Sequence, residues 1–184
     1  IIYGVTTGFG ENVRYTISPE DATTLQENIV RTHSVAVGEP LDREQARAVM
    51  LMTILNDGKG HSGIRIETLD LIRQMLNLDI YPWAPGEGSV GYLGVEGHLA
   101  MAYIGEGKIY DYGELLPAAE VLAKYGLAPL KLSYKEGLSM LNGTITVTAM
   151  ALLALYESVI TMQNAEIAGA LCYEALRGTD KELD

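Results

Sequence analysis

The sequence predicts a mainly α-helical fold with only short irregular or β segments. Two helix starts with strong capping residues, at Ser18 and Asp42, are followed by apolar residues at helical spacing. The longest helical pattern covers residues 144–177, whereas strand patterns are confined to residues 108–112 and 130–133. With 184 residues, of which 48% are hydrophobic, the chain can bury a full core.

The first predicted helix begins at Ser18, an N-cap residue followed by a proline at the first helical position and by two acids. Its apolar stripe consists of Ala22, Leu25, Ile29, His33 and Val37. Asp42 and Gln45 form a second capping pattern, and Asn56-Asp57-Gly58 predicts the end of the helix that they start.

Further helices are expected at residues 64–78, 98–104, 117–125 and 144–177, with a brief helix or irregular turn at residues 133–141. A glycine-rich loop, Trp83–Gly97, precedes the short helix at residues 98–104. From Val147 to Ile160 apolar residues lie on most sides of the last helix, as expected for a helix buried inside a bundle. We expect this apolar segment, which contains Glu157, to be too short to cross a bilayer.

The net charge of −11 comes from 13 basic and 24 acidic residues, and the basic residues form no cluster. This argues against nucleic-acid binding. The single cysteine, Cys172, excludes an internal disulfide and suits a reducing, cytoplasmic compartment. His33, His61 and His98 are not at the spacing of metal ligands, so we expect no metal site. We expect His61 and His98 to be structural.

Glycine-containing motifs recur along the chain. They are YGVTTGFG at residues 3–10, Leu25-Gln26-x-Asn28 through Thr32-His33 to Gly38, SGIR at 62–65, GSVG at 88–91, IGEG at 104–107 and KEGLSMLNGT at 135–144. In this order and spacing the motifs resemble those of the histidine and aromatic amino-acid ammonia-lyases, over nearly the whole chain. The resemblance implies the helical-bundle core of a fumarase- and aspartase-like fold, and a carbon–nitrogen lyase that assembles as a homotetramer.

The resemblance covers less than half of the usual length of that family. We therefore expect residues 1–184 to be a single fragment of the catalytic domain, either a proteolytic product or one half of a split enzyme. The expected partner is the complementary C-terminal half, because active sites in this family combine residues from several subunits. We expect the fragment to be inactive by itself.

Members of the family usually carry Ala-Ser-Gly directly after the GSVG motif. This triad cyclises to a methylidene-imidazolone (MIO), the electrophile that captures the substrate's amino group. Here Tyr92 and Leu93 follow the motif instead. If His98 is aligned with the histidine that follows the triad in the family, this sequence has a three-residue deletion that covers the triad. Leu93 has no hydroxyl to lose, and the nearby Ser89 is followed by Val90 rather than by glycine. The prosthetic group is therefore predicted to be absent, and no other cofactor is expected.

The resemblance assigns Tyr3 as the base that removes the substrate's β-proton. Asn142 is the residue that holds the prosthetic group or the amino-acid end of the substrate, and Gly4 belongs to the substrate site. An ordinary tyrosine pKa of about 10 is too high for a base at neutral pH, so the site must supply donors or positive charge. The alternative interpretation is a core tyrosine and a turn asparagine.

Thr32-His33 resembles the Ser-His pair that lines the ring pocket of histidine lyases, and it favours an imidazole-type substrate. Taken alone, a histidine on a buried stripe such as His33 is more often a core histidine whose hydrogen bonds are satisfied. Tyr92 and Glu96 replace the prosthetic region. They either fill its volume, or Glu96 meets a cationic nitrogen of the substrate.

The leading hypothesis is a lyase that works without the prosthetic group, by non-oxidative β-elimination of amine or ammonia to give an acrylate. A betaine has no lone pair to attack an electrophile, and its quaternary nitrogen leaves as a neutral tertiary amine. This reaction is similar to that of ergothionase, a member of the same family that lacks the group. Two alternatives remain open: a catalytically dead homologue that acts as a scaffold or regulatory subunit, and an ordinary histidine ammonia-lyase whose electrophile comes from another chain.

Overall fold

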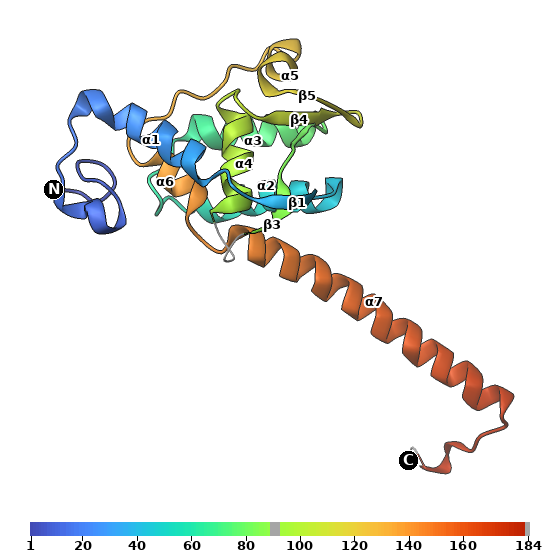
Figure 1. Ribbon diagram of the computed structural model, residues 1–184. Coiled ribbons are helices and arrows are strands. Elements are labelled where there is room, and N and C mark those ends of the chain that lie inside the picture. Colours follow the sequence, from blue (N-terminus) through green and yellow to red (C-terminus); the bar gives the residue numbers. More distant parts are fainter. Residues whose placement is uncertain (89–92, 183–184) are drawn as a thin grey trace. The chain divides into compact units, whose positions relative to one another are not determined.

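The computed structural model describes residues 1–88 and 93–182, and it divides into two units, residues 1–149 and 150–184 (Figure 1). The helices of the first unit are η1 (Gly10–Arg14), α1 (Pro19–His33), α2 (Arg43–Asp57), α3 (Ile66–Asn77), α4 (Gly94–Tyr103), α5 (Ala118–Lys124), α6 (Glu136–Leu141) and the start of α7 (Ile145–Ala175). The strands are β1 (Val37–Pro40), β2 (Tyr81–Pro82), β3 (Pro85–Glu87), β4 (Lys108–Asp111) and β5 (Glu114–Pro117). The predicted mainly α-helical fold is confirmed.

Both predicted helix starts are confirmed by their hydrogen bonds. Ser18 Oγ accepts the N–H of Asp21 at 3.1 Å. At the start of α2, Asp42 Oδ1 accepts the N–H of Gln45 at 2.8 Å, and Gln45 Oε1 accepts the N–H of Asp42 at 3.1 Å. This reciprocal pair satisfies two N–H groups that the first helical turn leaves unpaired.

Helix α1 ends at His33, before the predicted last member of its stripe. Val37 lies instead in β1, opposite Glu87 of β3 in an antiparallel pair. The expectation for Val37 was wrong because a strand pairing with a distant segment outweighs the local helical spacing.

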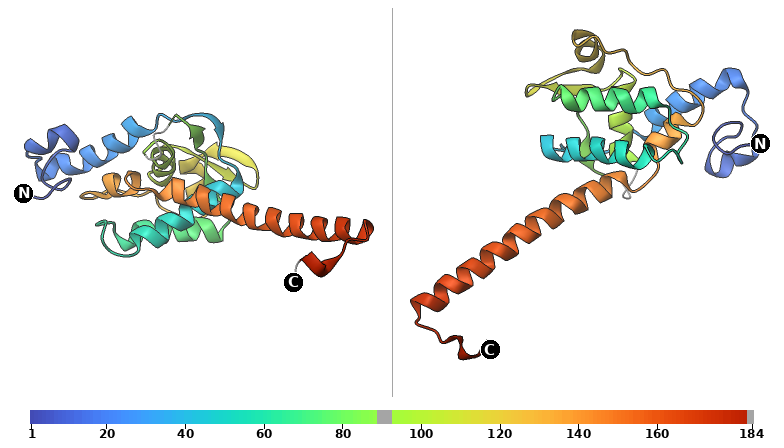
Figure 2. Two further views of the ribbon diagram at one scale, coloured as in Figure 1. Left: turned by 90° about the horizontal axis from the view of Figure 1, so that it is seen from below. Right: turned by 180° about the vertical axis from the view of Figure 1, so that it is seen from behind.

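The second sheet has the strand order β2-β4-β5, with antiparallel pairing throughout. Strands β4 and β5 form a hairpin whose central turn residues, Tyr112 and Gly113, have φ of 48° and 87°. Positive φ at both positions matches the twist of a two-residue hairpin. The strand predicted at residues 108–112 is therefore confirmed, and Figure 2 shows this hairpin beside α5.

The strand predicted at residues 130–133 is wrong. Its backbone groups bind partners that are not strands: Leu130 N–H donates to Tyr103 O at 2.9 Å, and Ser133 N–H donates to Glu136 Oε2 at 2.8 Å. The Lys131 carbonyl accepts from Arg65 Nη2 at 2.6 Å. A helical carbonyl and two side chains thus take the hydrogen bonds that a neighbouring strand would supply.

The carboxylate of Glu136 connects α6 to the start of α3. It is fully buried and accepts hydrogen bonds from Arg65 N–H (3.1 Å), Arg65 Nε (2.9 Å), Thr68 Oγ1 (2.8 Å) and Ser133 N–H (2.8 Å). Burial alone raises the pKa of this carboxyl, but these donors outweigh burial and hold the pKa below its usual value. Glu136 therefore fixes α6, and the asparagine that follows α6, relative to the start of α3.

Helix α4 packs against α1, and the two backbones come very close at Gly97. A Cβ at Gly97 would lie 2.9 Å from both the carbonyl carbon and the carbonyl oxygen of His33, which is closer than real Cβ contacts allow. Helix α4 also begins earlier than predicted, at Gly94 rather than at His98. No side chain caps this start; the carbonyl of Leu93 accepts the N–H of Gly97 at 2.8 Å.

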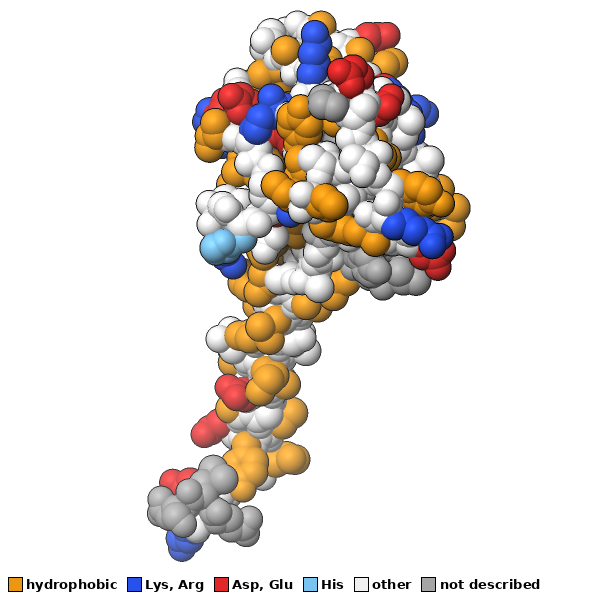
Figure 3. All heavy atoms as spheres, turned by 90° about the vertical axis from the view of Figure 1, so that its left-hand side faces the viewer, with side chains coloured by type: hydrophobic (Ala, Val, Ile, Leu, Met, Phe, Trp, Pro, Cys, Tyr) orange, Lys and Arg blue, Asp and Glu red, His pale blue; other side chains and the backbone are white. Residues whose placement is uncertain are grey.

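The second unit consists of α7 from residue 150 onward and η2 (Asp180–Glu182). Its hydrophobic side chains are exposed in this chain: Leu155 is 59% and Leu171 is 66% exposed, and Figure 3 shows such side chains along the helix. From residue 150 onward, the burial expected between Val147 and Ile160 is therefore not found within this chain, whereas Ala149 is buried.

The expectation that the apolar segment is too short to span a membrane concerned only Val147–Ile160. The longer helical region over residues 136–175 is long and apolar enough to do so, by length and composition alone. The apolar pattern continues past Ile160 with few charged residues, which lengthens the segment beyond the part first considered. Core helices of soluble proteins meet the same criterion.

Candidate functional site

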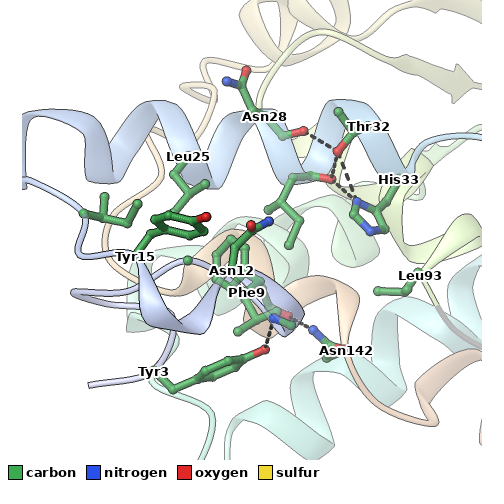
Figure 4. A pocket seen from close by; sticks show the side chains of 15 residues that line it. Tyr3, Phe9, Asn12, Tyr15, Leu25, Asn28, Thr32, His33, Leu93 and Asn142 are labelled. Atoms are coloured by element: carbon green, nitrogen blue, oxygen red, sulfur yellow. Dashed lines mark hydrogen bonds between the residues drawn. The ribbon is translucent and has the colours of Figure 1, made fainter. Parts of the chain in front are cut away.

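A cavity of about 650 Å³ in the first unit brings together four of the predicted site residues. Tyr3 comes from the opening motif, Thr32 and His33 from the end of α1, and Asn142 from the residue that follows α6 (Figure 4). Leu93, at the start of α4, also lines this cavity. Residues from distant parts of the sequence thus meet at one concave site, as in most small-molecule sites.

Tyr3 is held by the backbone of its own motif. Its hydroxyl accepts the N–H of Gly10 at 3.0 Å, and its ring packs edge-to-face on Phe9. Gly4 is buried with φ of +71°, and a Cβ there would lie 2.9 Å from Leu138. Gly4 does not line the cavity; it lets the opening motif pass close to α6, so its predicted contact with substrate stays a prediction.

Gln26 joins this opening motif to α6. Its buried amide donates to Gly4 O at 3.3 Å and accepts the N–H of Leu138 at 3.2 Å. The glutamine of the second sequence motif therefore sets the distance between the segments that carry Tyr3 and Asn142. The sequence marked Gln26 only as part of a motif and gave it no role.

The imidazole of His33 is oriented by its own helix. Its Nδ1 lies 2.8 Å from the carbonyl oxygen of Ile29, which can only accept a hydrogen bond, so Nδ1 carries the proton. In the neutral ring Nε2 then keeps its lone pair, available to accept a hydrogen bond. Thr32 Oγ1 donates to Asn28 O at 2.7 Å and lies 3.2 Å from His33 Nδ1, which further restrains the ring.

Asn142 ends α6 with a turn back onto the helix. Both its backbone N–H (3.0 Å) and its side-chain Nδ2 (3.2 Å) donate to the carbonyl of Leu138. The amide nitrogen is thus engaged within α6, and the amide oxygen is the atom of this side chain that can accept from a ligand.

The residues that replace the prosthetic region are only partly described. Tyr92, like Ser89 and Val90, lies outside the described residues. Glu96 is buried and does not line the cavity; its Oε1 accepts the N–H of Thr146 at 3.3 Å, at the start of α7. The structure therefore does not bring Glu96 together with Tyr3 and His33.

Leu93 occupies the position where α4 starts, with φ of 77° and ψ of −52°. This backbone conformation is strained for a residue with a side chain. The leucine side chain lines the cavity and offers only hydrocarbon, and the sequence at this point contains no Ala-Ser-Gly. The residues present do not fit a methylidene-imidazolone.

Three cavity residues had no signal in the sequence: Asn12 and Tyr15, from η1 and its flank, and Ile17. They belong to a short 3₁₀ helix and the segment that follows it, neither of which produces a regular pattern. Phe9 and Asn28 belong to the sequence motifs but were given no role. Within the described parts of the chain, no group of three His, Cys, Asp or Glu side chains could hold a metal ion.

The IGEG motif connects the two helices that flank the cavity. Glu106 binds Arg31 of α1 in a bidentate ion pair, with Arg31 Nε 2.8 Å from Oε2. The hydrogen bonds from Arg31 hold the pKa of Glu106 below its usual value. The pair anchors the turn after α4 to α1 close to Thr32 and His33.

Comparison with known proteins gives consistent results. The chain is 41% identical to histidine ammonia-lyase of Streptococcus pyogenes serotype M49 over 181 residues, which is 97% of this chain and 35% of that protein. The structure of histidine ammonia-lyase from Trypanosoma cruzi superposes with a TM-score of 0.93 at 37% identity, over 100% of this chain and 36% of that one. Ergothionase, an ergothioneine-degrading enzyme from Treponema denticola, also gives a TM-score of 0.93, at 29% identity over 100% of this chain and 37% of its own.

The chain thus spans about a third of the length of the relatives that it matches. The sequence profile of the aromatic amino acid lyases matches all of residues 1–184. The motifs that line the cavity are those by which the sequence resembles these enzymes. This chain belongs to the aromatic amino acid lyase family.

Proposed function

We propose that the protein containing this chain is a carbon–nitrogen lyase that eliminates an amine from an imidazole-type betaine and forms an acrylate. The observation that carries the proposal is the cavity that joins Tyr3, His33 and Asn142, with the hydrocarbon side chain of Leu93 in its wall. Similarity to histidine ammonia-lyases supports the lyase class, and similarity to ergothionase supports a betaine substrate. The activity belongs to the full-length protein and takes place in the cytoplasm.

Three of the cavity residues have roles in this reaction. Tyr3 takes the β-proton, and the electron pair of that C–H bond forms the carbon–carbon double bond while the amine leaves with the electrons of the C–N bond. His33 contacts the substrate ring, where Nε2 accepts the imidazole N–H. Asn142 uses its amide oxygen to orient the amino-acid end of the substrate.

Leu93 is the reason for proposing a betaine rather than a free amino acid. A primary amine is a poor leaving group and needs covalent activation, which the residues at this position do not provide. A quaternary ammonium leaves as a neutral tertiary amine and needs no electrophile. The absence of a cofactor is therefore part of the proposal.

The proposal is tested by offering the full-length protein an imidazole betaine, histidine, phenylalanine and tyrosine side by side. We expect acrylate absorbance to rise only with the betaine, together with release of the tertiary amine. Rapid ammonia release from histidine contradicts the proposal. So does an intact mass about 36 Da below the sequence mass, since forming a methylidene-imidazolone removes two waters. If neither substrate class reacts, the scaffold alternative is favoured.

Replacing His33 with leucine is expected to change substrate selectivity more than turnover. The substitution removes the acceptor nitrogen from the cavity wall and leaves an apolar side chain of similar size, so carbocyclic betaines should gain relative to imidazole betaines. A site that loses a hydrogen bond to its substrate shifts kcat/KM by roughly 10- to 100-fold. His61→Leu, at an exposed position outside the cavity, is the matched control. An unchanged ratio of the two kcat/KM values in His33→Leu would remove His33 from the ring-binding role.

We also propose that α7 assembles with the rest of the protein and with further copies of it, as a homotetramer. Exposed apolar side chains along residues 150–175 are costly in water. We expect residues 1–184 alone to associate, and addition of the complementary segment to give a defined oligomer in light scattering. Replacing Leu155 and Leu171 with glutamate should prevent this association, whereas Glu157→Gln and Glu174→Gln should not. A monodisperse monomer of residues 1–184 contradicts the proposal.

A further inference from the structure

A second, smaller cavity lies against the first. Its volume is about 310 Å³, and Tyr3, Leu138 and Asn142 line both cavities, so these residues form the wall between them. The other side of the small cavity includes Asp57 and Lys135. Neither residue has a part in the elimination proposed above.

Asp57, the last residue of α2, has an acceptor oxygen that receives no hydrogen bond from the described parts of the chain. The residue is only 2% exposed. Its Oδ1 accepts from Asn56 Nδ2 at 3.0 Å, whereas its Oδ2 is buried and has no hydrogen-bond partner in the described parts of the chain. Burial raises the pKa of this carboxyl, and the side chains of Asn56 and Ser62 oppose that rise. A buried carboxylate oxygen is costly unless a donor reaches it.

Lys135 supplies a cation to the same cavity from a strained backbone. Its φ is 66°, in the left-handed region that side chains disfavour. Its aliphatic stem lies against two glycines: a Cβ at Gly4 would be 3.5 Å from Lys135 Cγ, and one at Gly63 would be 3.7 Å from Cδ. Strained residues held in place by their surroundings are common at sites that clamp ligands. Because Asp57 Oδ2 has no partner, the Lys135 ammonium does not bind it directly.

We propose that this small cavity binds a zwitterion that carries a primary ammonium group and a carboxylate, as a small α-amino acid does. The ammonium donates to Asp57 Oδ2, and the carboxylate accepts from Lys135. A ligand that is only a cation is repelled by the Lys135 ammonium, and a ligand that is only an anion is repelled by the Asp57 carboxylate. A betaine carries both charges but has no N–H to donate. This site is separate from the ring-binding cavity and does not depend on the proposed elimination.

Four small probes test whether the ligand needs a positive charge, a negative charge and an N–H donor. Their binding to the full-length protein is measured by calorimetry or equilibrium dialysis. They are glycine, glycine betaine, methylamine and acetate. We expect glycine to bind at least about tenfold more tightly than each of the others, since only glycine satisfies both charges and donates a hydrogen bond to a charged acceptor. Equal binding of glycine and glycine betaine overturns the proposal, because Asp57 then receives no hydrogen bond from the ligand.

Two substitutions test the two ends of the site. Asp57→Asn and Lys135→Met are each expected to weaken glycine binding by about 10- to 100-fold. The matched controls are Asp70→Asn and Lys59→Met, which lie outside this cavity and should leave binding unchanged. Melting curves verify folding, and if Asp57→Asn fails to fold, the partly exposed Lys135→Met decides the outcome. Glycine binding that persists in Lys135→Met, or that disappears in His33→Leu, places the ligand elsewhere and overturns the proposal.

Discussion

Replacing Tyr3 with phenylalanine is expected to lower kcat of the full-length protein by roughly 10²- to 10⁴-fold, with little change in KM. The substitution removes one oxygen and keeps the ring that packs on Phe9. That oxygen is the proton acceptor in the proposed elimination, and the Gly10 N–H at 3.0 Å is placed to stabilise the charge of the phenolate. Substrate contacts with His33 and Asn142 are unaffected, so binding is retained.

Tyr15 provides the matched control for this experiment. It also lines the cavity and carries a phenol hydroxyl, but it has no role in the proposed reaction. We expect Tyr15→Phe to keep kcat within a few-fold of the parent protein, measured as acrylate absorbance on the same betaine. Equal losses in both variants, or a rise in KM that accounts for the whole loss in Tyr3→Phe, would show that Tyr3 binds substrate instead of moving the proton.

Replacing Glu136 with glutamine is expected to reduce the free energy of unfolding by about 3–5 kcal/mol, the usual result of breaking a buried ion pair. The carboxylate accepts hydrogen bonds from Arg65, Thr68 and Ser133, and an amide can satisfy only some of these donors. The urea midpoint of unfolding measures the loss. Glu67→Gln, an exposed acid on the first turn of α3, is the matched control and should change stability only slightly.

The pH dependence of stability gives a second measurement on the same residue. The pKa of Glu136 is lower in the folded protein than in the unfolded chain, so the unfolded chain takes up the proton first as pH falls. The stabilisation is complete above the ordinary glutamate range and is lost as pH falls through the lowered folded pKa. The difference in melting temperature between the parent and Glu136→Gln should therefore shrink from neutral pH towards acid. A difference that stays constant would show that the ionised form of Glu136 does not stabilise the fold.

Local signals in the sequence predicted the helices well. The Ser18 cap and the Asp42–Gln45 capping box involve residues within one turn of each other, so the sequence contains the whole interaction. The predicted strand at residues 130–133 failed because its backbone partners, such as Tyr103 and Arg65, are far away in sequence. The start of α4 was missed because Leu93 adopts positive φ and caps it without a side chain.

The candidate site was predicted in part, and mainly through motifs. Tyr3, His33 and Asn142 were found because they belong to motifs with a recognisable order, and the structure brings them to one cavity. Glu96 was grouped with them from sequence proximity to the missing triad, but its side chain points to the start of α7. The rest of the cavity wall, including Asn12, comes from a segment whose conformation depends on long-range packing, which no local pattern reports.

The contact between Gly97 and His33 has a consequence for how the substrate range can change. Leu93 and His33 both line the cavity, and the helices that begin and end beside them, α4 and α1, touch at Gly97. Sliding these helices apart would lose that contact. We therefore expect the cavity to be enlarged by shortening side chains such as Leu93, so that the size of the accepted substrate changes in discrete steps.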